Sequence, residues 1–224
     1  DKREHKATFA LTHNFTEDAV WRNEYSFLFE GLPSNIVDIC QYGFTEMLNN
    51  AIDHSGGTKV HISVIRDQEK VMISVVDNGE GIFQKIKRLC HLPDDRQALL
   101  ELAKGKLTTD PAHHSGEGIF FTSRVFDTFE INSKGVTFSH SAQRECDYIV
   151  ESGHSVNEAF AEVGTAISML ITRDATRVSQ TVFDEYAAPD EYRFNKTVVP
   201  VRLAQYDNEK LISRSQAKRL LTRI

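Results

Sequence analysis

The sequence predicts an α+β fold, a two-layer α/β sandwich in which one mixed, mostly antiparallel sheet carries its helices on one face. Over residues 34–54, apolar side chains recur every three to four positions, as on the buried face of a helix. Residues 59–66 alternate between apolar and polar side chains, and residues 71–76 are almost continuously apolar, as in strands. Helical segments are followed by runs of strands, and this order favours an antiparallel sheet.

The composition is that of an ordinary folded protein. Of the 224 residues, 40% are hydrophobic and 26% are charged, which excludes disordered, collagenous and low-complexity chains. No apolar run approaches the roughly 18 residues that a membrane span needs. The net charge of −6 argues against a general nucleic-acid binder. Three cysteines without a Cys-x-x-Cys pair predict free thiols in a reducing cytoplasm.

The elements before residue 60 are one weakly patterned segment, one short element and one long helix. The polar residues up to Asp18 give weak signals. Residues 24–29 fit either a short strand or an apolar helical turn, closed by the Gly-Leu-Pro of residues 31–33. The helix of residues 34–54 follows, and the Ser-Gly-Gly of residues 55–57 ends it.

Further strands and helices complete the main domain. The turn of residues 67–70 joins the two strands described above into a hairpin. Residues 82–106 are helical but broken at Pro93, and residues 119–126 form a short apolar helix. The remaining strands are expected at 129–131, 136–138, 147–150 and 166–171.

Changes in composition divide the chain into four parts. Residues 1–23 are an N-terminal extension and residues 24–172 the main domain. Residues 173–193 are polar, contain Pro189 and form a linker with a short helix. From residue 194 a strand-like run and a capping-box helix are too short to enclose a core, so residues 194–224 are expected to begin a second, truncated domain.

The first functional candidates, Glu46, Asn50 and Asp53, share the long helix. At 100° per residue, Asn50 lies about 40° from Glu46 and Asp53 about 20° on the other side, so the three form a polar stripe. Oxygen ligands one turn apart suit a hard cation such as Mg²⁺, and a glutamate there also suits a general base for water or a hydroxyl. A solvated helix face would show the same pattern.

The second group is the Asp77-Asn78-Gly79-Glu80-Gly81-Ile82 segment that follows the apolar strand of residues 71–76. An aspartate at a strand end is placed to accept a hydrogen bond from an exocyclic amine such as that of adenine. The two glycines let the backbone turn sharply beside a ligand. An ordinary Asn-Gly hairpin turn is the alternative, but the helical pattern that follows disfavours a second paired strand.

The third group is Ser115-Gly116-Glu117-Gly118, a pair of glycines that opens a short helix. Free backbone N–H groups and the positive end of the helix dipole at such a start attract phosphate. The segment is no Rossmann fingerprint, because a third glycine is missing. Glu117 is an unexpected charge beside an anion.

In this order and spacing, the three groups resemble the motifs of the GHKL (histidine kinase-like) ATPase superfamily. The stripe from Glu46 to His54 is similar to its N box, and Asp77-x-Gly79-x-Gly81 and Gly116-x-Gly118 are similar to its two glycine boxes. Gly164-Thr165 resembles the Gly-Thr that completes its adenine pocket. The resemblance covers residues 24–171 and implies the Bergerat-type ATP-binding fold.

By this resemblance, the motif residues have expected roles in the binding of ATP and Mg²⁺. It implies Glu46 as the base for water or a substrate hydroxyl, and Asn50 as a ligand of Mg²⁺. It implies Asp77 and Thr165 on the adenine, with the phosphates held beneath a lid of residues 82–115. The implied nucleotide-binding positions are Asn50, Asp53, Asp77, Gly79, Gly81, Ile82, Ser115, Gly116, Gly118 and Thr165.

The compact N box, without dimerisation helices, is most similar to the anti-sigma-factor serine kinase branch, and the last 30 or so residues resemble the start of a STAS-like domain. The resemblance implies a kinase or slow ATPase in a bacterial signalling protein, with a STAS-like or sigma-like partner. The alternatives are a non-catalytic ATP-dependent switch and a protein-binding module of a transcription regulator. A homodimer stays open. Neither a membrane nor a nucleic acid is an expected partner.

Overall fold

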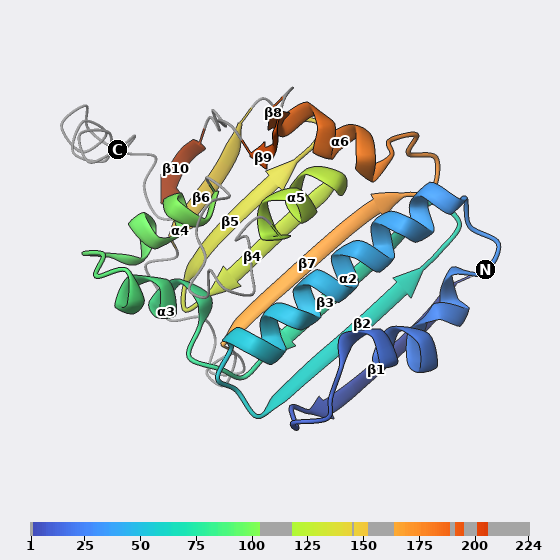
Figure 1. Cartoon of the computed structure of the whole chain (residues 1–224), viewed down its shortest axis with the longest axis horizontal. Coiled ribbons are helices and arrows are strands. Elements are labelled where there is room, and N and C mark those ends of the chain that lie inside the picture. The colour runs from blue at the N-terminus through green and yellow to red at the C-terminus, as the bar shows by residue number, and fades with distance from the viewer. Residues whose placement is uncertain are drawn as a thin grey trace.

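The computed structural model of the chain describes residues 2–103, 118–144, 146–151, 164–188, 191–194 and 201–205. Within these residues the chain forms an eight-stranded sheet with its main helices on one face, and a separate two-stranded ribbon (Figure 1). The order of strands in the large sheet is β1-β2-β3-β7-β4-β5-β6-β10. The predicted α+β, two-layer sandwich is confirmed.

The bounds of the elements follow the sequence patterns closely over residues 34–172, whereas the strands β8 and β9 within and beside the predicted linker were not expected. The large sheet contains β1 (Arg3–Ala10), β2 (Lys59–Arg66), β3 (Lys70–Asp77), β4 (Thr128–Ser133), β5 (Val136–Ser141), β6 (Asp147–Glu151), β7 (Thr165–Thr172) and β10 (Val201–Gln205), and the ribbon contains β8 (Ala187–Ala188) and β9 (Glu191–Phe194). The α-helices are α1 (Glu17–Val20), α2 (Ser34–His54), α3 (Ile82–Leu89), α4 (Asp95–Ala103), α5 (Gly118–Val125) and α6 (Ser179–Tyr186). Between α1 and α2 lie a π-helical turn, η1 (Trp21–Tyr25), and a 3₁₀ turn, η2 (Ser26–Phe29).

Alternation along the strands decides which side chains face the helices. In the order of the sheet, each pair of neighbouring strands from β1 through β7 to β6 is antiparallel, and β10 runs parallel to β6. On β2, Val60, Ile62 and Val64 are fully buried, whereas His61 between them is exposed. Because successive side chains of a strand point to opposite faces, the predicted apolar set forms the floor of the core.

The opening segment, weakly patterned in the sequence, forms the edge strand β1. It pairs with β2 from Arg3 opposite Arg66 to Ala10 opposite Lys59. Its burial alternates only between exposed and half-buried, because one side of an edge strand stays open and its inward face is only partly covered. Such a strand has too little buried apolar surface for its sequence pattern to reveal it.

Residues 24–29 lie within η1 and η2, so the helical-turn alternative is the one that the chain adopts. Tyr25 is fully buried there, and its hydroxyl donates to the Ile62 carbonyl over 3.1 Å. The Trp21 ring packs against the rings of Phe29 and Phe44, whose centroids lie 4.5 and 5.1 Å away. These aromatic contacts fix the η1–η2 segment against α2.

Helix α2 runs along the strand direction over β3 and β7, near the middle of the sheet (Figure 1). A side chain at Gly43 would collide with the ring of Phe126, which follows α5, and would come within 3.1 Å of Met169 Sδ. The glycine therefore lets α2 and the end of α5 approach closely over β7. This packing places the polar side of α2 next to α5.

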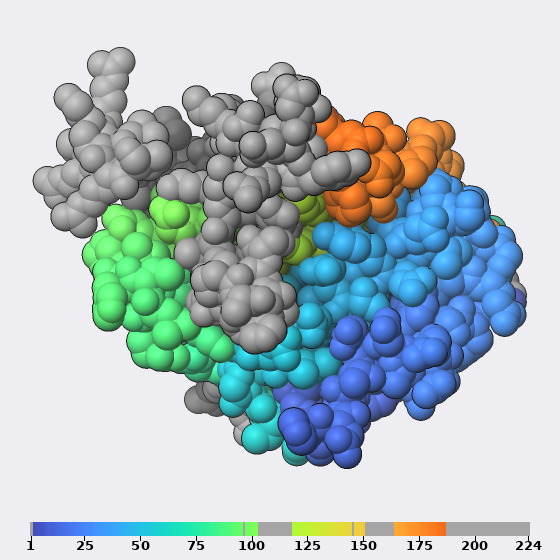
Figure 2. Space-filling model, viewed as in Figure 1, coloured from blue at the N-terminus to red at the C-terminus, as the bar shows by residue number. Residues whose placement is uncertain are grey.

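The linker predicted over residues 173–193 contains the predicted short helix, α6. In the space-filling view of the helical side, α6 (orange) and the pair α3–α4 (green) lie at separate edges of this layer (Figure 2). From the predicted last domain, residues 194–224, the structure describes Phe194 at the end of β9 and residues 201–205, the strand β10. The predicted domain boundaries stay a prediction. Among the described helices, none is both long and apolar enough to cross a bilayer.

Candidate functional site

Glu46, Asn50 and Asp53 lie on α2 as predicted. Glu46 and Asn50 are half-buried, and Asp53 is exposed. The amide nitrogen Nδ2 of Asn50 is buried and has no hydrogen-bond partner within the part of the chain that the structure describes. The oxygen and nitrogen of an asparagine amide exchange places by a simple flip, so either can face a ligand. An uncompensated buried amide is costly, which favours a ligand-facing role for Asn50.

Asp77 ends β3, and its side chain is almost completely enclosed. The residue is 7% exposed, and its Oδ1 accepts a hydrogen bond from the Gly79 N–H over 2.8 Å. Burial raises the pKa of Asp77 above its usual value, although backbone N–H groups of Gly79 and Thr165 and the charges of Lys134 and Lys85 oppose this effect. A buried carboxyl with few charged partners is suited to pairing with a neutral polar group such as a base amine.

Gly79 and Gly164 allow the chain to pack tightly around Asp77. A side chain at Gly79 would collide with the carbonyl of Ser55, just beyond α2. A side chain at Gly164 would collide with Asp77 Oδ1 and with the Gly79 backbone. The predicted sharp turn is therefore present, and its glycines are required by close backbone contacts.

Gly81 and Thr165 close the other side of the turn. Gly81 has φ of +94°, which favours glycine, and a side chain there would come within 2.7 Å of Ser133 Oγ. Thr165 lies directly opposite Asp77 in the β3–β7 pairing, and its Oγ1 accepts from the Ile82 N–H over 3.0 Å. Ser133 Oγ donates to the Gly164 carbonyl over 2.7 Å. The structure thus brings the predicted adenine-pocket residues of β3, α3 and β7 together.

Gly118, the first residue of α5, lies against the carboxylate of Glu46: a side chain at position 118 would occupy the place of Glu46 Oε2. The predicted base and one glycine of the predicted phosphate loop are therefore in direct contact. Ser115 and Gly116, also predicted to bind the nucleotide, lie outside the described residues.

Helix α2 connects the two groups of residues. At its C-terminal end, the Ser55 carbonyl accepts from the Glu80 N–H over 3.1 Å, and Lys85 of α3 donates to the His54 carbonyl. Glu46 lies nine residues earlier, roughly 13 Å along the helix. The Asp77 group and the Glu46–Gly118 contact thus lie at two levels of the same helix, and a cation such as Lys85 at its C-terminus is favourable for the helix dipole.

The polar groups on these elements are chemically suited to ATP and Mg²⁺. Asp77 offers a buried acceptor for a base amine, and Asn50 and Glu46 offer the oxygens that Mg²⁺ prefers. The start of α5 beside Glu46 offers backbone N–H groups for phosphate. The described residues thus supply candidate groups for the base, the metal ion and the phosphates.

The supporting residues Ser55, Lys85 and Ser133 were not predicted from the sequence. The Ser-Gly-Gly at Ser55 signals only the end of a helix, Lys85 looks like any solvated helix residue, and Ser133 lies past the predicted end of its strand. Each acts through a partner distant in sequence, at separations of 25, 31 and 31 residues. No local signal could have found them.

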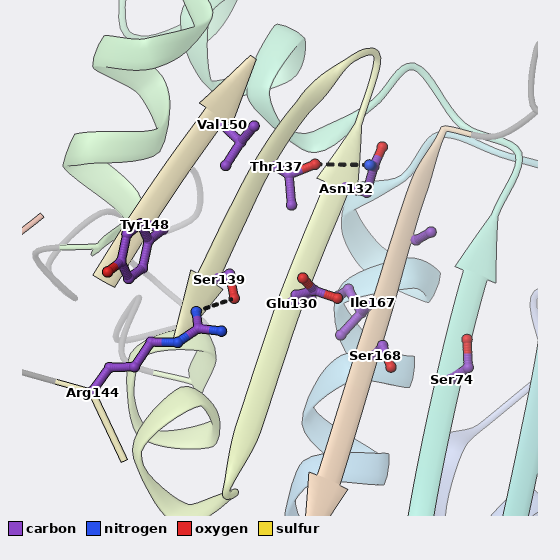
Figure 3. A pocket seen from close by; sticks show the side chains of 11 residues that line it. Ser74, Glu130, Asn132, Thr137, Ser139, Arg144, Tyr148, Val150, Ile167 and Ser168 are labelled. Atoms are coloured by element: carbon purple, nitrogen blue, oxygen red, sulfur yellow. Dashed lines mark hydrogen bonds between the residues drawn. The ribbon is translucent and has the colours of Figure 1, made fainter. Parts of the chain in front are cut away.

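The structure also has a hollow of about 650 Å³ on the opposite face of the sheet (Figure 3). Ser74, Ser168, Glu130 and Ser139 line it in register across β3, β7, β4 and β5, and Arg144 reaches Ser139 Oγ over 3.4 Å. Strand residues that alternate with them face the helices, as fully buried Met169 does. The hollow therefore lies on the other side of the sheet from the Asp77 group and α2.

Comparison with protein families gives a match to part of the chain. Residues 21–139 match the sequence profile described as the histidine kinase-like ATPase domain, just over half of the chain. A comparison with curated proteins gives no match. The matched segment contains α2, the Asp77 turn and Gly118. This chain, with its fold and its arrangement of motif residues, belongs to the histidine kinase-like ATPase domain family, a family that binds ATP.

Proposed function

We propose that the chain binds Mg-ATP between α2, the Asp77 turn and the start of α5, and that it transfers the γ-phosphoryl group to a protein partner or to water. The carrying observation is the placement of the Asp77 group and the Glu46–Gly118 contact at two levels of α2. A nucleotide lying along this helix would meet a base-binding acceptor at one end and metal- and phosphate-binding groups at the other.

At the base end, Asp77 would accept a hydrogen bond from the exocyclic amine of adenine. Its Oδ1 is held by the Gly79 N–H, which fixes the direction of the carboxyl group. Thr165, directly opposite on β7, is anchored by its own contact with the Ile82 N–H. Both side chains are thus held by backbone N–H groups, and an acceptor held in this way would discriminate against bases that lack the amine, because the buried carboxyl would then lose that partner.

At the phosphate end, Asn50 and Glu46 would act from the same side of α2. Magnesium, when bound, would neutralise part of the phosphate charge. Asn50 would hold it through its side-chain oxygen, with Asp53 one turn further along the helix. Glu46 would orient the attacking hydroxyl or water and accept its proton.

The cellular role of the chain and its protein partner also form part of the proposal. By the resemblance of its motifs, the chain would act as a kinase of the anti-sigma-factor type in a bacterial cytoplasm, and its partner would be a STAS-like or sigma-like protein. The STAS-like start proposed for residues 194–224 would place such a partner domain in the same polypeptide. The three cysteines are free, in keeping with a reducing compartment.

Isothermal titration with a non-hydrolysable ATP analogue tests the binding proposal. Asp77→Asn should weaken affinity about 10- to 100-fold, because an acceptor becomes a donor beside the adenine amine. Asn50→Ala should abolish the part of the affinity that depends on Mg²⁺, whereas Asn49→Ala on the neighbouring face of α2 should change little. Unchanged affinity in the Asp77 variant would exclude the proposed base pocket.

Turnover separates the enzyme from a non-catalytic switch. With γ-labelled ATP, the wild-type chain should release or transfer phosphate, and Glu46→Ala should bind the analogue with near-normal affinity but lose turnover. Asp38→Ala, an exposed carboxylate two turns earlier on α2, is the matched control. Tight binding without any phosphate release or transfer, with STAS-like and sigma-like candidate proteins present, would instead establish the switch.

A further inference from the structure

The segment of residues 173–186, here called the connector, contacts both helices of the proposed phosphate end. Asn35 in the first turn of α2 donates its amide protons to the carbonyls of Ala175 and Arg177, over 2.8 and 3.0 Å. Helix α6, which forms the second part of the connector, packs on α2 and α5. The connector therefore bridges the two helices whose residues Glu46 and Gly118 meet.

Arg177 forms the polar part of this bridge. Its guanidinium donates to the Phe126 carbonyl over 3.0 Å and to the Val125 carbonyl over 3.4 Å, and it pairs with the Asp127 carboxylate. Asp127 in turn accepts from the Thr172 N–H over 2.6 Å. The last carbonyls of a helix lack partners within it, so Arg177 caps the C-terminal end of α5 with a favourably placed positive charge.

Aromatic side chains form the apolar part. The ring of Phe183 on α6 lies 4.8 Å from that of Phe121 on α5 and 5.3 Å from that of Tyr42 on α2. Tyr186 packs on Phe120 at 5.1 Å. One side chain of the connector, Phe183, is thus inserted between the two helices, one turn before Glu46 on α2 and one turn after Gly118 on α5.

Helix α5 has only eight residues, so its position depends on tertiary contacts rather than on its own stability. Its N-terminal end meets Glu46, and its C-terminal end is held by Arg177. A change in how the connector docks would therefore move or loosen the end of α5 that faces the phosphates. The base pocket of Asp77 is built from β3, β7 and the turn after α2 and makes none of these contacts.

We infer that the connector is a positioning element for the proposed phosphate end, and that Arg177 is the residue through which it acts most directly. The inference rests on the proposed function. The inference implies that connector docking and triphosphate binding are coupled. If docking of the connector raises the affinity for the triphosphate by some factor, binding of the triphosphate must favour docking by the same factor, because linkage is reciprocal. Any domain attached after α6 would then sense the nucleotide state.

The test compares affinities for ATP and for adenosine, both with Mg²⁺, in three variants. Arg177→Ala should weaken ATP binding at least fivefold and leave adenosine binding within twofold, because only the phosphate end is displaced. Arg177→Lys, which keeps the charge without the fork of donors, should lie between Arg177→Ala and wild type. Arg173→Ala is the matched control, since the guanidinium of that connector arginine donates to the carbonyls of Asp67 and Gln68 in the β2–β3 turn, each over 3.2 Å.

The outcomes distinguish the inference from the proposed function. If wild-type protein binds no ATP, the proposed function fails. If wild-type protein binds ATP and Arg177→Ala keeps the wild-type ratio of the two affinities, or loses both equally, the positioning role is wrong. If Arg177→Ala does not fold, the same comparison is made with Phe183→Ala, and the exposed Val178→Ala serves as its control.

A measurement on the wild-type protein provides an independent check. Amide hydrogen exchange in residues 179–186 should slow in the presence of Mg-ATP and change much less with adenosine. Equal exchange rates in the free protein and in the Mg-ATP complex would overturn the coupling, even if ATP itself binds tightly.

Discussion

The carboxylate of Glu46 occupies the space beside Gly118 in which any other residue at position 118 would carry its side chain. One residue lies in the middle of a 21-residue helix and the other opens a helix of eight residues, 72 positions later in the chain. A negative charge at a helix start is stabilised by the helix dipole, so this contact holds Glu46 and α5 together.

Gly118→Ala should displace Glu46 with little effect on stability. The colliding atom is at the far end of a flexible side chain, so the carboxylate can rotate away, and we expect the free energy of unfolding to change by less than about 1 kcal/mol. Turnover should fall towards that of Glu46→Ala, because the proposed base is misplaced. Steady-state phosphate release and thermal unfolding measure the two effects; full turnover in a folded variant would show that the contact is not needed.

Asp77→Asn should separate stability from binding through its pH dependence. Burial raises the pKa of Asp77, so the folded state favours its neutral form, and wild-type stability is lost as pH rises through this pKa. Asparagine does not ionise, so the variant does not lose stability in this way as pH rises. Relative to wild type, the variant should therefore gain stability as pH rises above the ordinary aspartate pKa of about 4, while nucleotide affinity falls.

Urea unfolding at several pH values measures that difference, with the exposed Asp38→Asn as control. A variant that becomes relatively less stable as pH rises over the same range would contradict the direction of the shift.

Asp147→Asn should be among the most destabilising single substitutions in the described part of the chain. Asp147 Oδ2 accepts from Arg124 Nη2 over 2.7 Å and Oδ1 from His140 Nδ1 over 2.6 Å, with an Asp147 side chain only 2% exposed. Removing its charge leaves Arg124 buried without compensation, a change that costs about 3–5 kcal/mol.

The pH dependence of this cost has the opposite sign to that of Asp77. Burial alone would raise the pKa of Asp147, but hydrogen bonds from His140 and Arg124 hold it below its usual value. The stabilisation is therefore present above about pH 4 and is lost as pH falls through the pKa of the folded state. Unfolding free energies of wild type and variant should converge in acid, whereas substitution of the exposed Asp184 on α6, Asp184→Asn, should change the free energy of unfolding little.

Gly79→Ala should weaken both the fold and the nucleotide site. A methyl group there meets the Ser55 carbonyl, and because this is backbone it cannot rotate away. Overpacking of this kind costs about 1–3 kcal/mol, and we expect ATP affinity to fall as the turn shifts. Gly56→Ala has open space around it and only the strain of φ +65°, so it should leave affinity unchanged. Chemical unfolding and titration with ATP check both variants.

Patterns within a few residues of each other were sufficient for much of the fold and for the candidate site. The apolar stripe of α2 carries the polar stripe of Glu46 and Asn50 beside it, since both follow from the 3.6-residue period of one helix. The turn after Asp77 could be predicted from the sequence for a similar reason, because an apolar strand, an aspartate and two glycines are neighbours in the chain. Strand β1 escaped detection because its partner begins 49 residues beyond its end and only one of its faces is even partly buried.

Interactions between distant parts of the chain were decided only when it folded. No local pattern indicates that Arg177 caps α5, that Arg124 of α5 pairs with Asp147 of β6, or that Glu46 fills the space beside Gly118. Such contacts depend on where complete elements pack, and packing is set by the sum of many weak, non-directional apolar contacts rather than by any short motif. The chemical groups of the site were thus visible in the chain itself, whereas their common position along α2 and the connector that holds them arise from tertiary packing.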